Sequence, residues 1–309
     1  MHFRIGALLC GIVAMTACSL TAAATLEVQP APEGCGAARP AAPAPPAAAA
    51  NRIPDSRAAS GSHDVAWAWL GSPTSRYDHN ALGSAVHAGS LHALVRRPGG
   101  ALLEVSLQLP PTRVIEDRAP RIADLDGNGF DEIIVVESDL RLGASIAVYG
   151  VQADDPKTPP ALVERARSPY LGASHRWLNP VGVADFDDDG YAEIVAVTTP
   201  HVGGVLTLYR YRPPTLQPVV TMAGLANHRF GTVEQQLAAI VETRGHWPAV
   251  IVPAMGMRAL HAVRLTRGEW REVSAPAALP APVQRVTPLA SGVCAALANG
   301  AEVRVLLRD

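Results

Sequence analysis

Two aspartate-rich segments contain oxygen-bearing side chains at the spacing that a hard cation requires. In Asp124–Glu132 (the first loop) and Asp185–Glu193 (the second loop), such side chains recur at positions 1, 3 and 5, glycine follows at position 6, and glutamate stands at position 9. Ca²⁺ binds about six to eight oxygens, including backbone carbonyls. We therefore predict two Ca²⁺-binding turns. The predicted ligands are Asp124, Asp126, Asn128, the Phe130 carbonyl and Glu132, and then Asp185, Asp187, Asp189, the Tyr191 carbonyl and Glu193.

Two other interpretations of these loops have different requirements. An EF-hand needs a glutamate at position 12 and flanking helices. Position 12 is Val135 in one segment and Ala196 in the other, and both lie in β-type apolar runs, so the EF-hand is disfavoured. The other interpretation is a turn held by Asp and Asn side chains without a metal. That alternative stays open, but the repetition of the spacing favours a metal in at least one loop.

The acidic segments belong to a longer internal repeat. The second begins 61 residues after the first, at position 185 against position 124. Each is followed by a short apolar run, a glycine-bearing turn and a second run that ends in Tyr149 or Tyr209. Each unit therefore consists of strand, acidic loop, strand, turn and strand, which is the pattern of one propeller blade. Such a blade needs neighbours to bury its faces.

Fainter copies without the carboxylates flank the two intact units, at 91–109, 245–265 and 290–307. No segment keeps a helical period over three turns. We therefore predict an all-β fold, a single β-propeller of about five four-stranded blades. The run Val65–Leu70 is expected to complete the last blade and close the ring, because closure removes exposed sheet edges.

The loops resemble the D-x-D-x-D-G-x-x-D repeats of FG-GAP/VCBS-type proteins, the integrin alpha-like β-propellers, in their bacterial exported form. The flanking segments 114–121, 176–185, 199–204 and 226–231 add to the resemblance, which covers about residues 75 to 309. It implies an exported Ca²⁺-binding propeller and no single activity. The chain departs from the pattern by Glu at position 9, by Asn128 at position 5, and by blades without ligands.

The N-terminus has the features of a targeting segment. His2 and Arg4 precede an apolar run too short to span a bilayer. Residues 22–24 form a signal-peptidase site, whereas residues 15–18 resemble a lipobox with Cys18 as the lipid-bearing residue; both interpretations stay open. We predict a signal at 1–24, a disordered Pro/Ala-rich tether at 25–60 and the propeller at 61–309. The expected location is the periplasm, the outer membrane through a lipid anchor, or the extracellular space.

The four cysteines leave one pair for the exported chain. Cys10 lies in the signal segment, and Cys18 is either removed or lipidated. Cys35 and Cys294 remain, and an oxidising compartment permits a disulfide between them. Such a bridge would tie the tether to the last repeat. Two unpaired thiols are the alternative.

Charge and motifs limit the function classes. The net charge is −2 and the pI about 6.6, which argues against a nucleic-acid partner. No nucleophile elbow, phosphate loop or H-E-x-x-H is present. We therefore expect a non-enzymatic interaction module for an unknown protein or glycan ligand, without a transmembrane span. The alternatives are a polysaccharide-active enzyme and a lectin-like module.

Two further sets of residues have both a functional and a structural interpretation. Trp177, Trp247 and Trp270 either stack on sugar rings or pack between blades. His79, His175 and His228 lie in similar sequence contexts and are expected on one face of the ring. They form either a binding cluster or, as we favour, hydrogen bonds to loops of the next blade.

Overall fold

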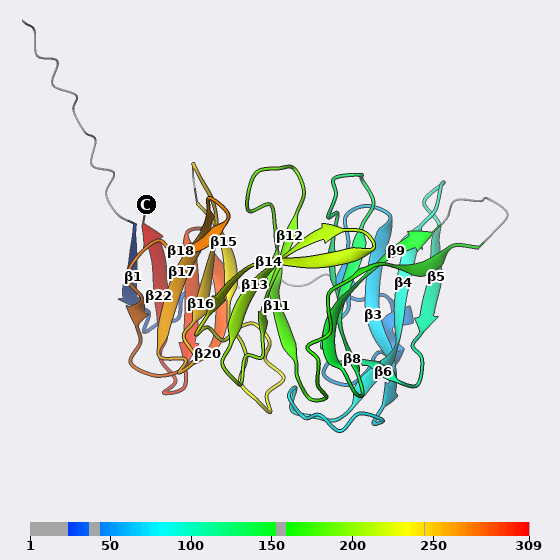
Figure 1. Ribbon diagram of the computed structural model, residues 1–309, viewed down its shortest axis with the longest axis horizontal. Helices are drawn as coiled ribbons and strands as arrows, with labels where there is room; N and C mark the ends of the chain where they lie inside the picture. Colours follow the sequence, from blue (N-terminus) through cyan, green and yellow to red (C-terminus); the bar gives the residue numbers. More distant parts are fainter. Residues whose placement is uncertain (1–23, 37–43, 153–158, 244, 309) are drawn as a thin grey trace, which may run out of the picture.

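The computed structural model describes residues 24–36, 44–152, 159–243 and 245–308. These residues form β-strands, turns and one 3₁₀ helix, η1 (Ala47–Asn51), so the predicted all-β class is confirmed. The strands form three sheets of thirteen, five and four strands. Figure 1 shows them as a curled row that follows the order of the chain. Cys18 and the predicted signal segment up to residue 23 lie outside the described residues.

Antiparallel pairing divides the strands into five groups. The first group contains β2 (Ala59–Ser60), β3 (Val65–Thr74), β4 (His87–Arg96) and β5 (Leu102–Gln108). The second contains β6 (Arg113–Ile115), β7 (Arg121–Ala123), β8 (Glu132–Asp139), β9 (Gly143–Gln152) and β10 (Ala161–Arg167). The third contains β11 (Leu178–Ala184), β12 (Glu193–Thr198), β13 (Val205–Arg212) and β14 (Thr215–Ala223).

The other two groups are separate sheets. The fourth contains β15 (Ala239–Thr243), β16 (His246–Pro253), β17 (Ala259–Thr266), β18 (Glu269–Glu272) and β19 (Ala277–Ala278). The fifth contains β20 (Val283–Leu289), β21 (Gly292–Leu297), β22 (Glu302–Arg308) and β1 (Thr25–Pro30). The first three groups form one sheet only through single residue pairs, Ala88 with Ile115 and Arg167 with Thr215.

The hydrophobic cores lie between neighbouring groups. Along β8, Ile133 and Val135 enter the core shared with the first group, whereas Ile134 and Val136 enter the core shared with the third. Successive side chains of a strand point to opposite faces, so β8 is apolar on both. The next pair of groups repeats this division along β12. The groups are therefore stacked face to face, with an apolar core between each pair of neighbours.

Buried polar side chains connect the second, third and fourth groups. The amide nitrogen of Gln235, in the β14–β15 connection, donates to Asp117 (3.1 Å) and to the Asn179 side-chain oxygen (3.3 Å). Asn179 lies on β11, and Asp117 lies between β6 and β7. All three side chains are buried, so these bonds fix the relative position of the three groups.

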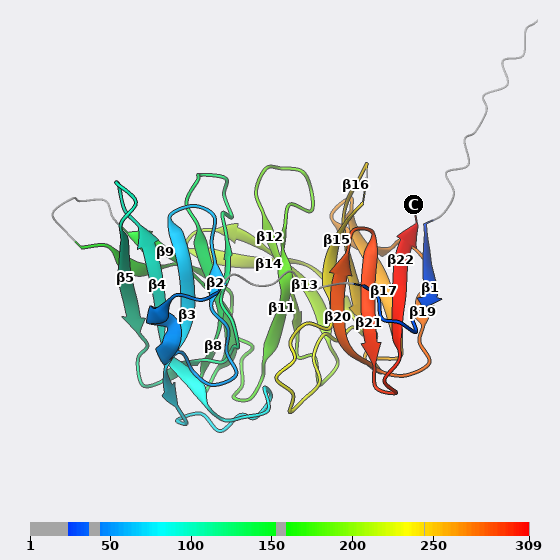
Figure 2. The same cartoon turned by 180° about the vertical axis from the view of Figure 1, so that it is seen from behind.

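The prediction that Val65–Leu70 closes the ring is wrong. That run lies in β3, which pairs with β4 in the first group. The last sheet is completed instead by β1, which pairs along β22 from Thr25 opposite Arg308 to Pro30 opposite Val303. The first and fifth groups lie at opposite ends of the row in both views (Figures 1 and 2), so the sheets are open.

The interval 25–60 is also more ordered than the predicted tether. It supplies β1, η1 and β2, and Ile53 is buried in the core of the first two groups. The alternation in β1 explains its pairing, because Leu26 and Val28 pack against the last core while the intervening residues are polar. The Pro/Ala content concealed this short period-2 pattern. Residues 37–43 of the interval lie outside the described residues.

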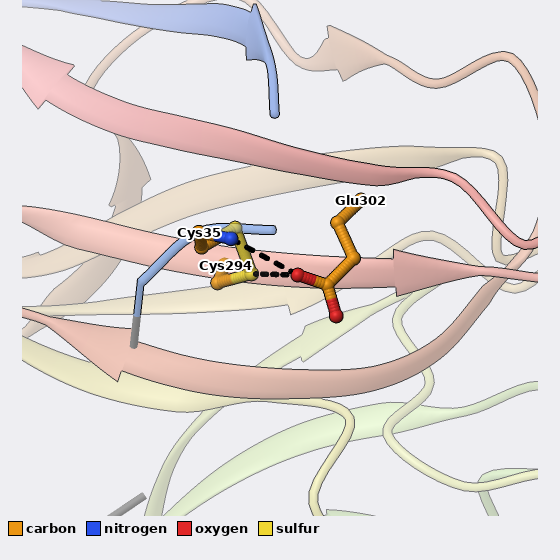
Figure 3. A group of neighbouring side chains, drawn as sticks. All are labelled: Cys35, Cys294 and Glu302. Carbon is orange, nitrogen blue, oxygen red and sulfur yellow. Dashed lines mark hydrogen bonds between the residues drawn. A yellow bond between two sulfur atoms is a disulfide. The ribbon is translucent and has the colours of Figure 1, made fainter. Parts of the chain in front are cut away.

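A disulfide joins this N-terminal segment to the last sheet. Cys35 and Cys294 are bonded, with their Cα atoms 5.9 Å apart, so the bridged alternative is the one present. The Cys35 amide donates to a Glu302 carboxylate oxygen at 3.0 Å (Figure 3). The N-terminal segment is thus attached to the fifth group by strand pairing, by a hydrogen bond and by a covalent bond.

Candidate metal-binding loops

Each acidic loop connects two neighbouring antiparallel strands of its group. The first loop runs from the end of β7 into β8, and the second runs from the end of β11 into β12. In the first loop the Asp124 carboxylate accepts the amides of Asn128 (3.1 Å) and Gly129 (2.8 Å). Gly129 has a φ of 84°, a conformation that glycine adopts without strain. Asp124 therefore closes the turn.

The second loop repeats these bonds at the corresponding residues. Asp185 accepts the amides of Asp189 (3.3 Å) and Gly190 (3.0 Å), and Gly190 again has a φ of 84°. At position 5, the side-chain oxygen of Asn128 accepts the Phe130 amide (2.8 Å), and that of Asp189 accepts the Tyr191 amide (2.9 Å). The two loops thus have the same local structure because they have the same Asp/Asn spacing.

The glutamate at position 9, where the resembled pattern has aspartate, accepts a backbone amide of its own loop. Glu132 accepts the Leu125 amide (2.9 Å), and Glu193 accepts the Phe186 amide (3.1 Å). Both glutamates are the first residue of a buried strand. From there the carboxylate reaches back into the loop and accepts an amide beside the first aspartate.

The structure brings three predicted ligands of each loop together. Asp124, Asp126 and Glu132 offer oxygens within 4.8 Å of one another, as do Asp185, Asp187 and Glu193, so either cluster could hold a metal ion. Asp189 is not in the second cluster. The ligand roles of Asn128 and of the Phe130 and Tyr191 carbonyls stay predictions.

The aspartate at position 3 provides a test of whether a cation fits. Oδ1 of Asp126 and Oδ1 of Asp187 are both buried and have no hydrogen-bond partner. A buried carboxylate oxygen without a donor is destabilising by about 1–3 kcal/mol or more. The same atom is unsatisfied in both loops. A cation between the three carboxylates would satisfy it, so the residues present fit a metal.

The clustered acids of the first loop have no ion-pair partner among the described residues, and their mutual repulsion affects the pKa of Glu132. Burial raises the pKa of Glu132 to about 7, and the carboxylates of Asp126, Asp124 and Asp64 add to the increase. No basic side chain among the described residues forms an ion pair with the three clustered acids of this loop. Arg165 lines the same cavity as two of these acids, Asp126 and Glu132, but within the described part of the chain it forms no ion pair with them.

The second loop has an internal cation. The Arg210 guanidinium pairs with Asp187, and its Nε donates to Glu193 at 3.3 Å. Burial raises the pKa of Glu193, whereas Arg210 acts in the opposite direction.

Strand register explains why the first loop lacks this arginine. Ile194 pairs with Tyr209 and Ile133 pairs with Tyr149, so one position further Arg210 faces Glu193 whereas Gly150 faces Glu132. The two loops therefore differ in charge although their backbones match.

The loops also connect neighbouring groups. The residue at position 8 donates its amide to the preceding group: Asp131 to Asp64 (2.7 Å), and Ala192 to the Leu125 carbonyl of the first loop (2.9 Å). The Asp131 carboxylate additionally accepts the amide of His63 (2.7 Å). Sequence reasoning missed Asp64, Asp131 and Arg210. Only the acidic position 8 of the first loop gave any local signal of these contacts.

The three predicted histidines have hydrogen-bond partners and do not form one metal cluster. His79 bonds Glu116 (2.6 Å) and His175 bonds Asp78 (2.7 Å), each across a group boundary. His228 bonds the Thr232 carbonyl and also His201, a residue that sequence reasoning missed. These contacts agree with the structural interpretation of the histidines.

The tryptophans differ in their accessibility. Trp177 is 2% exposed and donates to the Glu116 carbonyl (3.0 Å), and Trp270 is 6% exposed. Sugar stacking on these two rings is therefore wrong, because both pack between groups. Trp247 is 46% exposed.

The third cluster of side chains with metal-ligand chemistry lies at the disulfide. Cys35, Cys294 and Glu302 lie close together, but the cysteines are joined as a disulfide and so offer no thiolate. Within the described part of the chain, no helix has the length and hydropathy needed to cross a membrane. Neither a scan of protein-family models nor a search of curated proteins finds a match.

Proposed function

We propose that this chain is an exported Ca²⁺-binding β-propeller of the FG-GAP/VCBS type, which acts as a non-enzymatic interaction module. The observation that carries the proposal is the unsatisfied Oδ1 of Asp126, inside a carboxylate cluster without an internal cation. The first loop is the principal Ca²⁺ site. In the second loop Arg210 takes the place of the ion.

The donor set favours Ca²⁺ over other metals. The clustered groups are all carboxylates, which suit hard cations, whereas Zn²⁺ and Cu²⁺ favour imidazole and thiolate ligands. Mg²⁺ requires a near-ideal octahedron, while Ca²⁺ accepts irregular geometries. Each loop supplies its clustered carboxylates from positions 1, 3 and 9, and such an irregular arrangement suits Ca²⁺ better than Mg²⁺.

Several observations support the propeller and export parts of the proposal. Five antiparallel groups follow one another, and each shares a core with its neighbour. In this proposal the groups are the five blades, and β1 completes the last one in an open ring. The disulfide agrees with an oxidising compartment, as does the signal-like N-terminus.

The hydrogen bonds of the loop carboxylates favour an interaction module over an enzyme in this proposal. The carboxylates of both loops accept backbone amides within their own turns, which fixes their orientation. Carboxylates that are fixed in this way stabilise a turn and hold an ion. In this proposal the ion fixes the loops between blades, and a partner binds elsewhere on the module.

Thermal unfolding with and without Ca²⁺ tests the proposal. At 100 times the dissociation constant, one site adds about 2.7 kcal/mol to the free energy of unfolding. We expect EDTA to lower the melting temperature of the wild type and to leave Asp126→Asn unchanged. Asp188→Asn is the matched control, because Asp188 lies in an acidic loop but outside both clusters. An equal response of wild type and Asp126→Asn to EDTA would contradict the proposal.

A further inference from the structure

A cavity of about 370 Å³ opens between the third and fourth groups, beside the second loop. Its walls come from β13 and β14 on one side, and from β16, β17 and the β17–β18 turn on the other. Its lining includes Asp187, Arg210, Val220, Trp247, Leu265 and Arg267. The volume lies within the range of about 300–1,000 Å³ that is typical of small-molecule sites.

The apolar wall of this cavity contains an exposed indole. Trp247 keeps 46% of its surface exposed, whereas Trp69, Trp177 and Trp270 are buried. Leu265 and Val220 form an aliphatic floor, and both also contact the core between the two groups. The face of an aromatic ring carries partial negative charge and attracts weakly positive C–H groups. The flat C–H face of a pyranose ring matches such a surface.

The polar wall supplies paired donors and acceptors. Asp187 and Arg210 form an ion pair whose side chains are 26% and 27% exposed, so the pair is fixed but still reachable from solvent. A guanidinium beside a carboxylate can bond two adjacent hydroxyl groups, one as donor and one as acceptor. Arg267, in the turn after β17, is exposed at the cavity and adds one positive charge.

Other occupants fit these walls less well. A folded protein partner needs an interface of roughly 800 Å² and about 20–30 residues per side, which extends far beyond the walls of this cavity. A purely aliphatic ligand would cover the ion pair and Arg267 without bonding their remaining polar atoms. A sugar ring presents both C–H faces and hydroxyl groups, and so matches the apolar and polar walls together.

We propose that this cavity binds one pyranose ring of a glycan, with Trp247 stacked on the ring and the Asp187–Arg210 pair bonding its hydroxyl groups. Arg267 favours a sugar that carries a carboxylate, so a uronic acid binds more tightly than the neutral hexose. The site supplies a ligand for the interaction module proposed above. It does not depend on Ca²⁺ in the first loop, because its own charge is supplied by arginine.

Saturation-transfer NMR on the full chain tests this site, with the methyl glycosides of glucose, galactose, mannose and glucuronic acid as probes. We expect transfer to the ring protons of at least one glycoside, with the glucuronide binding more tightly than methyl glucoside. Trp247→Ala should weaken binding about tenfold or more. Phe230→Ala is the matched control, since Phe230 is also an exposed aromatic residue (58%) but does not line the cavity. Arg267→Gln should remove only the preference for the glucuronide.

The same spectra in EDTA separate this proposal from the calcium proposal. Binding that persists in EDTA supports the cavity site, whatever the thermal unfolding experiment shows. The proposal is overturned if none of the four glycosides shows transfer, if Trp247→Ala binds as the wild type does, or if EDTA abolishes binding. Transfer to N-acetyltryptophanamide in the absence of transfer to any sugar would also overturn it and would identify a peptide site.

Discussion

Arg210 lies 3.3 Å from Oε1 of Glu193, whereas the corresponding residue opposite Glu132 is Gly150. Two loops with the same backbone turn thus have different charges. The second contains its own cation, and the first has three clustered carboxylates without one. This single cross-strand difference distinguishes a turn paired with arginine from the turn in which we propose a metal.

Replacing Arg210 should create a second metal site. We expect Arg210→Gly to raise Ca²⁺ binding from about one to about two ions per chain in isothermal titration calorimetry, because removal of the guanidinium leaves Asp187 and Glu193 unpaired. Arg210→Lys is the control, since it keeps a positive charge and should keep one site. An unchanged stoichiometry in the glycine variant would show that Arg210 does not exclude the ion.

Reduction of the disulfide should destabilise the fifth group. The bond joins residues 259 positions apart, so it constrains a long loop of the unfolded chain. Its loss should lower the free energy of unfolding by about 2–5 kcal/mol. Urea unfolding of the wild type with dithiothreitol should match that of Cys35→Ser/Cys294→Ser without it. A wild type that is insensitive to the reductant would argue against the bond.

Acid should destabilise the fold through a buried histidine pair. His201 and His228 lie 2.9 Å apart, and burial lowers their pKa values to about 4 and about 3. The unfolded side chains titrate near pH 6.5, so the unfolded state binds more protons below that pH. The contribution to stability is complete above about pH 6.5 and is lost as the pH falls toward the folded values.

Urea unfolding at pH 7 and pH 5 measures this effect. Each proton taken up on unfolding changes the free energy by about 1.4 kcal/mol per pH unit in that window. We expect His201→Gln/His228→Gln to lose less stability than the wild type between the two pH values. His175→Gln, at a half-exposed position, serves as the control. If wild type and double variant lose equal stability, the pair does not govern the acid response.

The sequence predicted local features better than distant ones. The turn at each loop was recognisable because Asp, Asn and Gly at fixed offsets bond amides within five residues. The apolar run after each loop likewise predicted a strand, and β8 and β12 lie there. Each of these depends on contacts made close by in the chain.

Features that depend on contacts across the chain escaped sequence reasoning. The pairing of β1 with β22 joins Thr25 to Arg308, and the short alternation of β1 lies in a segment dominated by Pro and Ala. Arg210 follows Asp187 by more than twenty residues and meets it only through the β12–β13 register. The exposure of Trp247 depends on how the third and fourth groups pack, which composition does not report.

The position of the bound ion decides whether the first loop is the Ca²⁺ site. A crystal structure of the wild type grown with CaCl₂ should show an anomalous peak bound by Asp124, Asp126 and Glu132, with metal–oxygen distances of about 2.3–2.6 Å. The second loop should show no such peak, and Arg210 should remain paired with Asp187. A first loop without a peak in saturating CaCl₂, or a peak in the second loop alone, would contradict the account.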